Sequence, residues 1–292
     1  MTPWSRSPTR TSPSRPRRPE LARHDGAPVE EATSRDGTTI AFDRSGEGRP
    51  VVLIGGALSG RSAAEKLASL LARRFTVIAF DRRGRGDSGD TAPYAVDREV
   101  EDIESLIVAA GGRASVFGHS SGAVLALEAA RTLPHRITKL ALYEPPLIVG
   151  DSRAPLPEDF VKRLDALISA DRRGDAVDYF LTTGPGMPAD VVAGMRQEPL
   201  WASFESIAHT LAYDARLVRD ATGGGPAPLR RWASVGVPTL VLDGGASPDW
   251  IRNAALALTE VLPDAQRRTL EGQDHGPDPK LLAPALEAFF AD

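Results

Sequence analysis

Short apolar runs alternate with segments of helical periodicity over most of the chain, a pattern typical of α/β proteins. Continuous apolar runs such as VVLI and VIAF indicate strands that are buried on both faces of a parallel sheet. Strands are predicted at 38–46, 50–58, 75–81, 114–120, 139–145, 237–245 and 265–272. Helices are predicted at 61–73, 96–110, 121–133 and 277–290. We therefore expect an α/β core, residues 31–146 and 233–292, with a mostly parallel, doubly wound sheet.

The strand rhythm disappears between residues 147 and 232. Stretches such as EDFVKRLDALISADRRGDAVDYFL and LWASFESIAHTLAYDARLV place apolar residues at helical spacing. This segment is expected to form a helical lid that is inserted into the core.

The first 30 residues differ from the rest of the chain. They are rich in Pro, Ser, Thr and Arg and carry few apolar side chains, so they cannot offset the entropy lost on ordering. We expect a disordered N-terminal tail over residues 1–30. No stretch of the chain approaches the roughly 18 apolar residues of a membrane span, which favours a cytoplasmic protein.

The amino-acid composition and the net charge limit the classes of molecule that the protein is expected to bind. The chain has 292 residues, of which 41% are hydrophobic and 25% charged, as in proteins that bury a substantial core. The net charge of −4 does not favour binding to nucleic acid or to a membrane, because these surfaces are also negatively charged. The absence of cysteine excludes disulfides, thiolate metal sites and a cysteine nucleophile. We expect a small-molecule substrate, no metal and no cofactor, and the oligomeric state stays open.

One glycine-rich stretch imitates a cofactor motif. Gly84-x-Gly86-x-x-Gly89 has the spacing of a dinucleotide fingerprint and follows a predicted strand. It is followed by the sequence Asp-Thr-Ala-Pro, which cannot begin the helix whose N-terminus would bind a pyrophosphate. We interpret it as a tight turn.

The segment GHSSG, residues 118–122, lies where a predicted strand meets a predicted helix. The spacing Gly118-x-Ser120-x-Gly122 in that context is typical of a nucleophile elbow, in which a serine occupies a sharp strand-to-helix turn. Glycine allows the tight turn, and the helix N-terminus favours a developing negative charge. Ser120 is therefore the predicted nucleophile, and the backbone N–H of Ser121 is a predicted oxyanion donor.

From residue 34 to the end the chain resembles the α/β-hydrolase family. Besides GHSSG, the resemblance rests on VVLIGGA, on FDRRGRGDSG at 80–89 and on LEGQDHG at 270–276. It implies that His275 acts as general base and then general acid, since the other four histidines occupy the tail, the elbow, a helix end or the lid. It also implies that the backbone N–H of Ala57, which follows the first buried strand, is the second oxyanion donor.

The acid that orients His275 departs from the common family pattern. Many members carry it three residues after the glycine that ends the penultimate strand, and that position is Ser247 here. Glu144, at the end of the strand after the nucleophile helix, is the favoured acid because a buried carboxylate needs a partner, and some haloalkane dehalogenases have a similar arrangement. Asp249 and a Ser–His dyad remain alternatives.

A serine nucleophile indicates acyl chemistry, namely hydrolysis of an ester, lactone or thioester through an acyl-enzyme. The apolar lid residues indicate a mainly apolar small-molecule substrate. Two other functions stay open: acyl transfer, cyclisation or perhydrolysis on the same fold, and ligand binding with an idle triad. The sequence does not identify the substrate or its pathway.

Deleting residues 1–28 is expected to leave the melting temperature and ester hydrolysis nearly unchanged, because the segment has too few apolar residues to dock on the core. Thermal denaturation and an esterase assay on the truncated and full-length chains measure this. A fall of many degrees, or a loss of solubility, would contradict the predicted tail.

Overall fold

The computed structural model of the protein describes residues 29–151, 153–219 and 228–292. The predicted tail therefore lies outside the described residues except for its last two. The described residues form an eight-stranded sheet with the order β1-β2-β4-β3-β5-β6-β7-β8. Its strands are β1 (Glu30–Thr33), β2 (Thr39–Ser45), β3 (Arg49–Ile54), β4 (Phe75–Phe80), β5 (Ala114–His119), β6 (Ile137–Tyr143), β7 (Thr239–Gly244) and β8 (Ala265–Leu270).

The sheet is mostly parallel. β2 runs antiparallel to both of its neighbours, β1 and β4, and every other pair of adjacent strands is parallel. The carboxyl ends of β3, β5, β6 and β7 therefore meet at one edge of the sheet, where α/β folds bind their ligands. This confirms the predicted α/β fold with a mostly parallel, doubly wound sheet.

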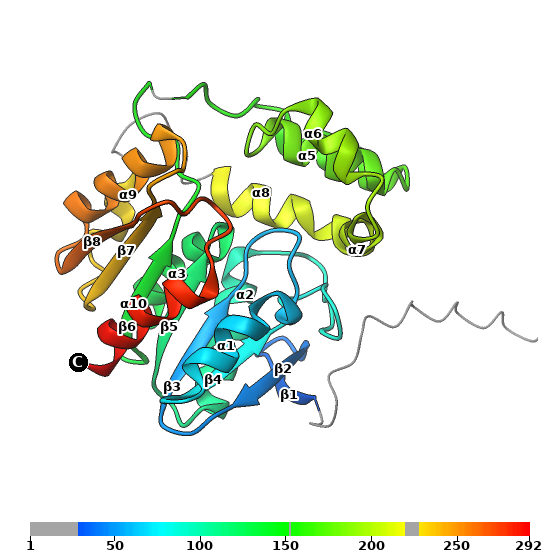
Figure 1. Cartoon of the computed structure of the whole chain (residues 1–292). Helices are drawn as coiled ribbons and strands as arrows, with labels where there is room; N and C mark the ends of the chain where they lie inside the picture. The colour runs from blue at the N-terminus through cyan, green and yellow to red at the C-terminus, as the bar shows by residue number, and fades with distance from the viewer. Residues whose placement is uncertain (1–28, 152, 220–227) are drawn as a thin grey trace, which may run out of the picture.

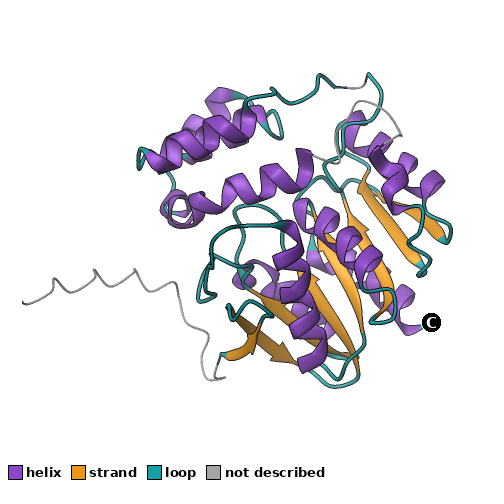
Figure 2. Ribbon diagram, turned by 180° about the vertical axis from the view of Figure 1, so that it is seen from behind, coloured by secondary structure: helices purple, strands orange, loops and turns teal. Residues whose placement is uncertain are grey.

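Helices cover both faces of the sheet (Figure 1, Figure 2). The apolar sides of α1 (Glu65–Leu71) and α10 (Pro279–Ala291) pack on one face in a shared core cluster. The apolar sides of α2 (Val96–Ala109), α3 (Ser121–Thr132) and α9 (Asp249–Val261) pack on the other face in a second core cluster. The strands between these two layers are buried almost throughout, which explains their continuous apolar runs.

A helical segment connects β6 to β7 and forms an apolar cluster of its own. In Figure 1 its helix α8 lies between the sheet and the pair α5 and α6. The segment contains α4 (Phe160–Ser169), α5 (Arg173–Thr183), α6 (Ala189–Met195), α7 (Leu200–Ile207) and α8 (Leu211–Arg219). Short 3-10 turns lie at Arg61–Ala64, Ala208–Thr210 and Pro228–Trp232. No helix among the described ranges has both the length and the apolar character needed to cross a membrane.

The structure differs from the predicted elements at three places. β1 is an additional edge strand whose residues are mostly polar, so it gives no apolar run. α9 is an additional helix, although Ile251, Ala254, Ala255 and Leu258 have helical spacing and are all buried. The strand predicted at 50–58 ends at Ile54, because the chain leaves the sheet there and turns at Ala57 and Leu58, where Leu58 has a positive φ of 57°.

Candidate active site

Ser120 occupies the turn between β5 and α3 in a strained conformation. Its backbone has φ 56° and ψ −126°, which a residue with a Cβ rarely adopts. The backbone N–H of Ser120 donates to the carbonyl of Tyr143 at 2.9 Å, so the end of β6 holds the turn. The strain is retained because the surrounding sheet and helix determine the turn, as is common at functional sites.

Two glycines make this turn possible. A Cβ on Gly118 would lie 2.4 Å from the carbonyl oxygen of Gly122. A Cβ on Gly122 would lie 2.4 Å from the carbonyl oxygen of Ile54, at the end of β3. Both positions therefore require glycine if β3, β5 and α3 are to approach this closely.

His275 lies in the loop between β8 and α10 and contacts two other predicted site residues. Its Nε2 is 3.0 Å from Ser120 Oγ, and its Nδ1 is 2.7 Å from Glu144 Oε2. The His275 side chain is 47% exposed, whereas the Glu144 side chain is fully buried. The structure thus brings Ser120, His275 and Glu144 into one line of contacts that opens toward solvent at the histidine.

The Glu144 carboxylate follows β6 and has three hydrogen-bond donors. Besides His275, the backbone N–H of Gly244 donates to Oε1 at 2.7 Å and the Ser247 hydroxyl donates to Oε1 at 2.5 Å. Burial by itself raises the pKa of Glu144, but the hydrogen bonds from His275, Ser247 and Gly244 outweigh it and lower the pKa. Glu144 is therefore ionised at neutral pH despite its burial.

The alternative acid Asp249 is not brought to the histidine. It is the first residue of α9, its side chain is 78% exposed, and its carboxylate pairs with Arg252 one turn further along the helix. Ser247, at the position where many family members carry the acid, instead supports Glu144. The sequence signal for this contact is a hydroxyl at the common acid position combined with a carboxylate at the end of β6.

The loop after β3 lies directly against Ser120. A Cβ on Gly56 would lie 2.9 Å from Ser120 Cβ, so this backbone closes one side of the elbow. In the part of the chain that the structure describes, the backbone N–H groups of Ala57 and Ser121 have no hydrogen-bond partner. The two predicted oxyanion donors are therefore available to a ligand.

Backbone strain is concentrated around these residues. Among the described residues, the non-glycine positions with positive φ are Leu58, Ser120, Glu144 and Asp171. The first three belong to the loop after β3, the elbow and the end of β6, which all meet at the same edge of the sheet. Such clustering is typical of a functional site.

Two residues that were not predicted as site residues hold the histidine loop. The Tyr143 hydroxyl donates to the carbonyl of Asp274 at 2.5 Å, and His119 Nε2–H donates to the carbonyl of His275 at 2.8 Å. Burial and the neighbouring His275 lower the pKa of His119 to about 4, so His119 is a neutral donor at neutral pH. Their position beside Ser120 and Glu144 in the sequence is the only signal that could have suggested them.

The family of the chain follows from its sequence and agrees with its fold. A sequence model of the alpha/beta hydrolase family matches residues 51–285, and the chain belongs to this family. The resemblance inferred from the motifs is thereby confirmed.

A solved structure of an alpha/beta hydrolase from Sphaerobacter thermophilus is 55% identical in sequence, with a TM-score of 0.84. The match covers 89% of this chain and all of that one. Among curated proteins, a 2-(acetamidomethylene)succinate hydrolase from Mesorhizobium japonicum is 29% identical over 81% of this chain and 85% of its own length. A non-heme chloroperoxidase from Streptomyces lividans is also 29% identical, over 88% of this chain and 98% of its own length.

His119 is expected to make stability depend on pH. The unfolded chain binds a proton at this histidine near its ordinary pKa of 6.5, whereas the folded protein binds it only near pH 4. Proton uptake therefore favours unfolding, so stability decreases as the pH falls from about 6.5 to about 4.

His119→Gln retains an amide N–H for the carbonyl of His275 but cannot be protonated. The melting temperatures of both proteins at pH 7 and pH 4.5 are expected to show a smaller fall for the variant. An equal fall in both proteins would contradict the assignment.

Proposed function

We propose that the protein is a serine hydrolase that cleaves an ester, lactone or thioester of a mainly apolar small molecule. The observation that carries the proposal is the continuous line of contacts from Ser120 Oγ through the His275 ring to the buried Glu144 carboxylate. A hydroxyl, an imidazole and a carboxylate in this order generate a nucleophile at neutral pH.

The contacts of His275 support one tautomer. Because Glu144 is ionised and accepts only, Nδ1 carries the proton and Nε2 presents its lone pair to the Ser120 hydroxyl. Ser120 Oγ attacks the substrate carbonyl while Nε2 takes the hydroxyl proton. The imidazolium that forms is stabilised by the Glu144 carboxylate, which does not itself become protonated.

The tetrahedral intermediate carries its negative charge on the former carbonyl oxygen. The backbone N–H groups of Ala57 and Ser121 flank the elbow and donate to this oxygen, and the N-terminus of α3 adds a favourable dipole. His275 then gives its proton to the leaving group. Water, deprotonated by the same nitrogen, attacks the acyl-enzyme and releases the acid.

We propose that α4–α8 act as a lid that shapes the acyl pocket. Ala57 and Leu58, which follow β3 beside the nucleophile, pack against the apolar cluster of these helices. The acyl group would therefore meet apolar side chains once its carbonyl is bound at Ser120. The relative from Mesorhizobium japonicum is likewise named as a hydrolase.

A second candidate function is perhydrolysis, in which hydrogen peroxide replaces water at the acyl-enzyme. The similarity to a non-heme chloroperoxidase over 88% of this chain favours it. Product analysis in water with added peroxide distinguishes the two, because perhydrolysis releases a peracid in place of the acid. A protein that only binds ligands would form no acyl-enzyme and would not be labelled by a fluorophosphonate.

Ser120→Ala is expected to abolish hydrolysis of p-nitrophenyl acetate and labelling by a fluorophosphonate probe, with the fold retained. The matched control is Ser121→Ala, which removes a hydroxyl next door but leaves the backbone N–H in place. It is expected to stay active, at a rate far above that of Ser120→Ala, because the nucleophile and both backbone N–H groups remain. If Ser121→Ala is inactive and Ser120→Ala is active, the nucleophile is Ser121 and not Ser120.

Glu144→Gln keeps the shape of the side chain but removes the charge that stabilises the imidazolium. We expect kcat to fall by about three to four orders of magnitude, as for the acid of other triads, with little change in the circular dichroism spectrum.

The matched control for Glu144→Gln is Asp249→Asn, because Asp249 lies at the surface. Its kcat is expected to fall less than about tenfold. The opposite ranking would assign the acid to the loop after β7, and small effects of both variants would indicate a dyad.

A further inference from the structure

We infer that Asp214, in α8, is a positioning residue that holds both peptide groups of the oxyanion hole from one buried carboxylate. The inference rests on the proposed function, since it concerns the same oxyanion. Asp214 belongs to the helical segment between β6 and β7 and not to the α/β core, and it lies far from the elbow in sequence.

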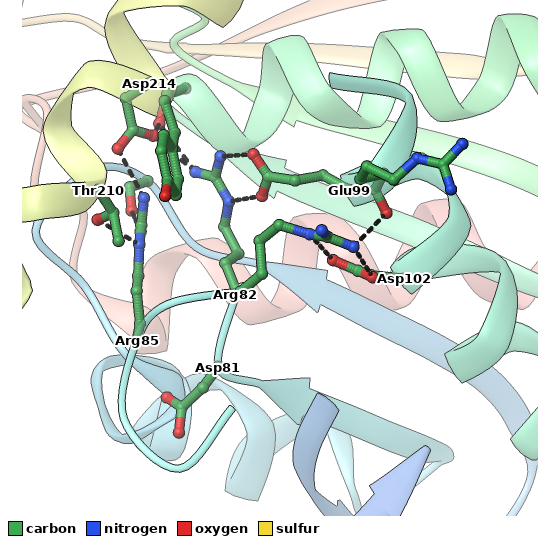
Figure 3. A network of polar contacts seen from close by, with 12 residues as sticks. Asp81, Arg82, Arg85, Glu99, Asp102, Thr210 and Asp214 are labelled. Atoms are coloured by element: carbon green, nitrogen blue, oxygen red, sulfur yellow. Dashed lines mark hydrogen bonds and ion pairs between the residues drawn. The ribbon is translucent and has the colours of Figure 1, made fainter. Parts of the chain in front are cut away.

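The Asp214 carboxylate is buried, with 1% of the side chain exposed, and both of its oxygens accept hydrogen bonds (Figure 3). Oδ1 accepts from the Ser121 hydroxyl at 2.7 Å and from Arg82 Nη1 at 2.7 Å. Oδ2 accepts from Arg85 Nη2 at 2.6 Å. One carboxylate on α8 therefore binds the start of α3 and two arginines of the loop after β4.

Arg85 carries the first link to the oxyanion hole. Its Nη1 donates to the carbonyl oxygen of Gly56 at 2.6 Å, and the Ser59 hydroxyl donates to the same oxygen at 2.7 Å. The Gly56 carbonyl and the Ala57 N–H belong to one planar peptide unit. A guanidinium on the carbonyl side therefore sets the direction of the N–H on the other side and strengthens its dipole.

Ser121 carries the second link. Its hydroxyl donates to Asp214, while its backbone N–H is the other oxyanion donor. A side chain that is anchored in this way restricts rotation of the first peptide of α3. The orientations of the Ala57 and Ser121 N–H groups are thus fixed by Arg85 and by the Ser121 hydroxyl, which both bind the Asp214 carboxylate.

The charges of this cluster are balanced and leave little freedom to move. Arg82 also forms two hydrogen bonds of 2.7 Å with the Glu99 carboxylate, which accepts a third from the Tyr94 hydroxyl. Burial by itself raises the pKa of Asp214, but Arg85 and Arg82 outweigh it and lower the pKa. Displacing any member would leave a buried charge without its partner, which is strongly unfavourable.

The chain offers a matched control next to this cluster. Arg83 and Asp102 form another buried pair, with hydrogen bonds of 2.8 and 2.7 Å, and Asp102 is as buried as Asp214 (Figure 3). Neither residue of this pair has a hydrogen bond to Gly56, Ala57 or Ser121 among the described contacts. Asp102→Asn therefore unbalances a buried ion pair without touching the oxyanion donors.

The experiment compares wild type, Asp214→Asn and Asp102→Asn, each assayed well below its melting temperature. The readouts are kcat and KM for p-nitrophenyl acetate and the inhibition constant of phenylboronic acid, whose tetrahedral serine adduct places an oxygen in the oxyanion hole. Asp214→Asn is expected to lower kcat by about 10- to 100-fold, somewhat less than the loss of a donor. Its KM should stay nearly constant, and the boronate should bind more weakly by a similar factor.

Asp102→Asn is expected to lose thermal stability but to keep kcat and boronate affinity within about threefold. Equal losses in both variants, or no loss in Asp214→Asn, would overturn the inference. If Asp214→Asn does not fold, Arg85→Lys decides: it keeps the charge but cannot reach Asp214 and Gly56 together as the guanidinium does, so the same loss supports the inference and wild-type values overturn it.

Fluorophosphonate labelling of the wild type separates this inference from the proposed function. A wild type that reacts at Ser120 while Asp214→Asn behaves as Asp102→Asn refutes the positioning role alone. A wild type that neither reacts nor hydrolyses esters refutes both.

Discussion

The close approach of β3, β5 and α3 is the constraint on which the site depends. The turn at Ser120 forms only because Gly118 and Gly122 leave no Cβ to collide with backbone atoms of α3 and β3. The same approach places the loop after β3 against Ser120, where the Ala57 N–H has no hydrogen-bond partner among the described residues. A parallel sheet with short connections then aligns the ends of β6 and β7 at the same edge, where Glu144 and Gly244 meet.

The site is held rigid by a dense set of polar contacts rather than by apolar packing alone. Ser247 and Gly244 saturate one oxygen of Glu144, and Tyr143 and His119 bind successive carbonyls of the histidine loop. These contacts oppose the strain at Ser120 and Glu144, whose positive φ values would otherwise relax. Several hydrogen bonds therefore hold each of these loops in one conformation. Preorganised catalysis requires such rigidity, because hydrogen-bond donors must already point at the atom on which negative charge develops.

The arginines after β4 have a role that their motif does not reveal. The glycine-rich stretch resembles a cofactor fingerprint in sequence, yet in the fold Arg82 and Arg85 turn inward beneath the elbow and pair with carboxylates from α2 and α8. The helical segment between β6 and β7 is thereby joined to the core by buried charges as well as by apolar contacts. A movement of α8 would therefore shift the peptide groups of Gly56 and Ser121, to which Asp214 is linked by hydrogen bonds.

Local sequence patterns predicted the parallel α/β architecture and two of the proposed catalytic residues, because buried strands, an elbow between glycines and a late histidine loop are each defined by neighbouring residues. The sequence also favoured Glu144, since a carboxylate at the end of a buried strand needs a partner. It left open the choice between Glu144 and Asp249, because loop length does not specify which way a side chain turns. Only the tertiary structure places Asp249 on the surface of α9, and Ser247 and His119 beside the site. The link from Asp214 to Ser121 and Arg85 joins residues more than 90 positions apart, and such a contact arises only when the folded chain buries charges that must find one another.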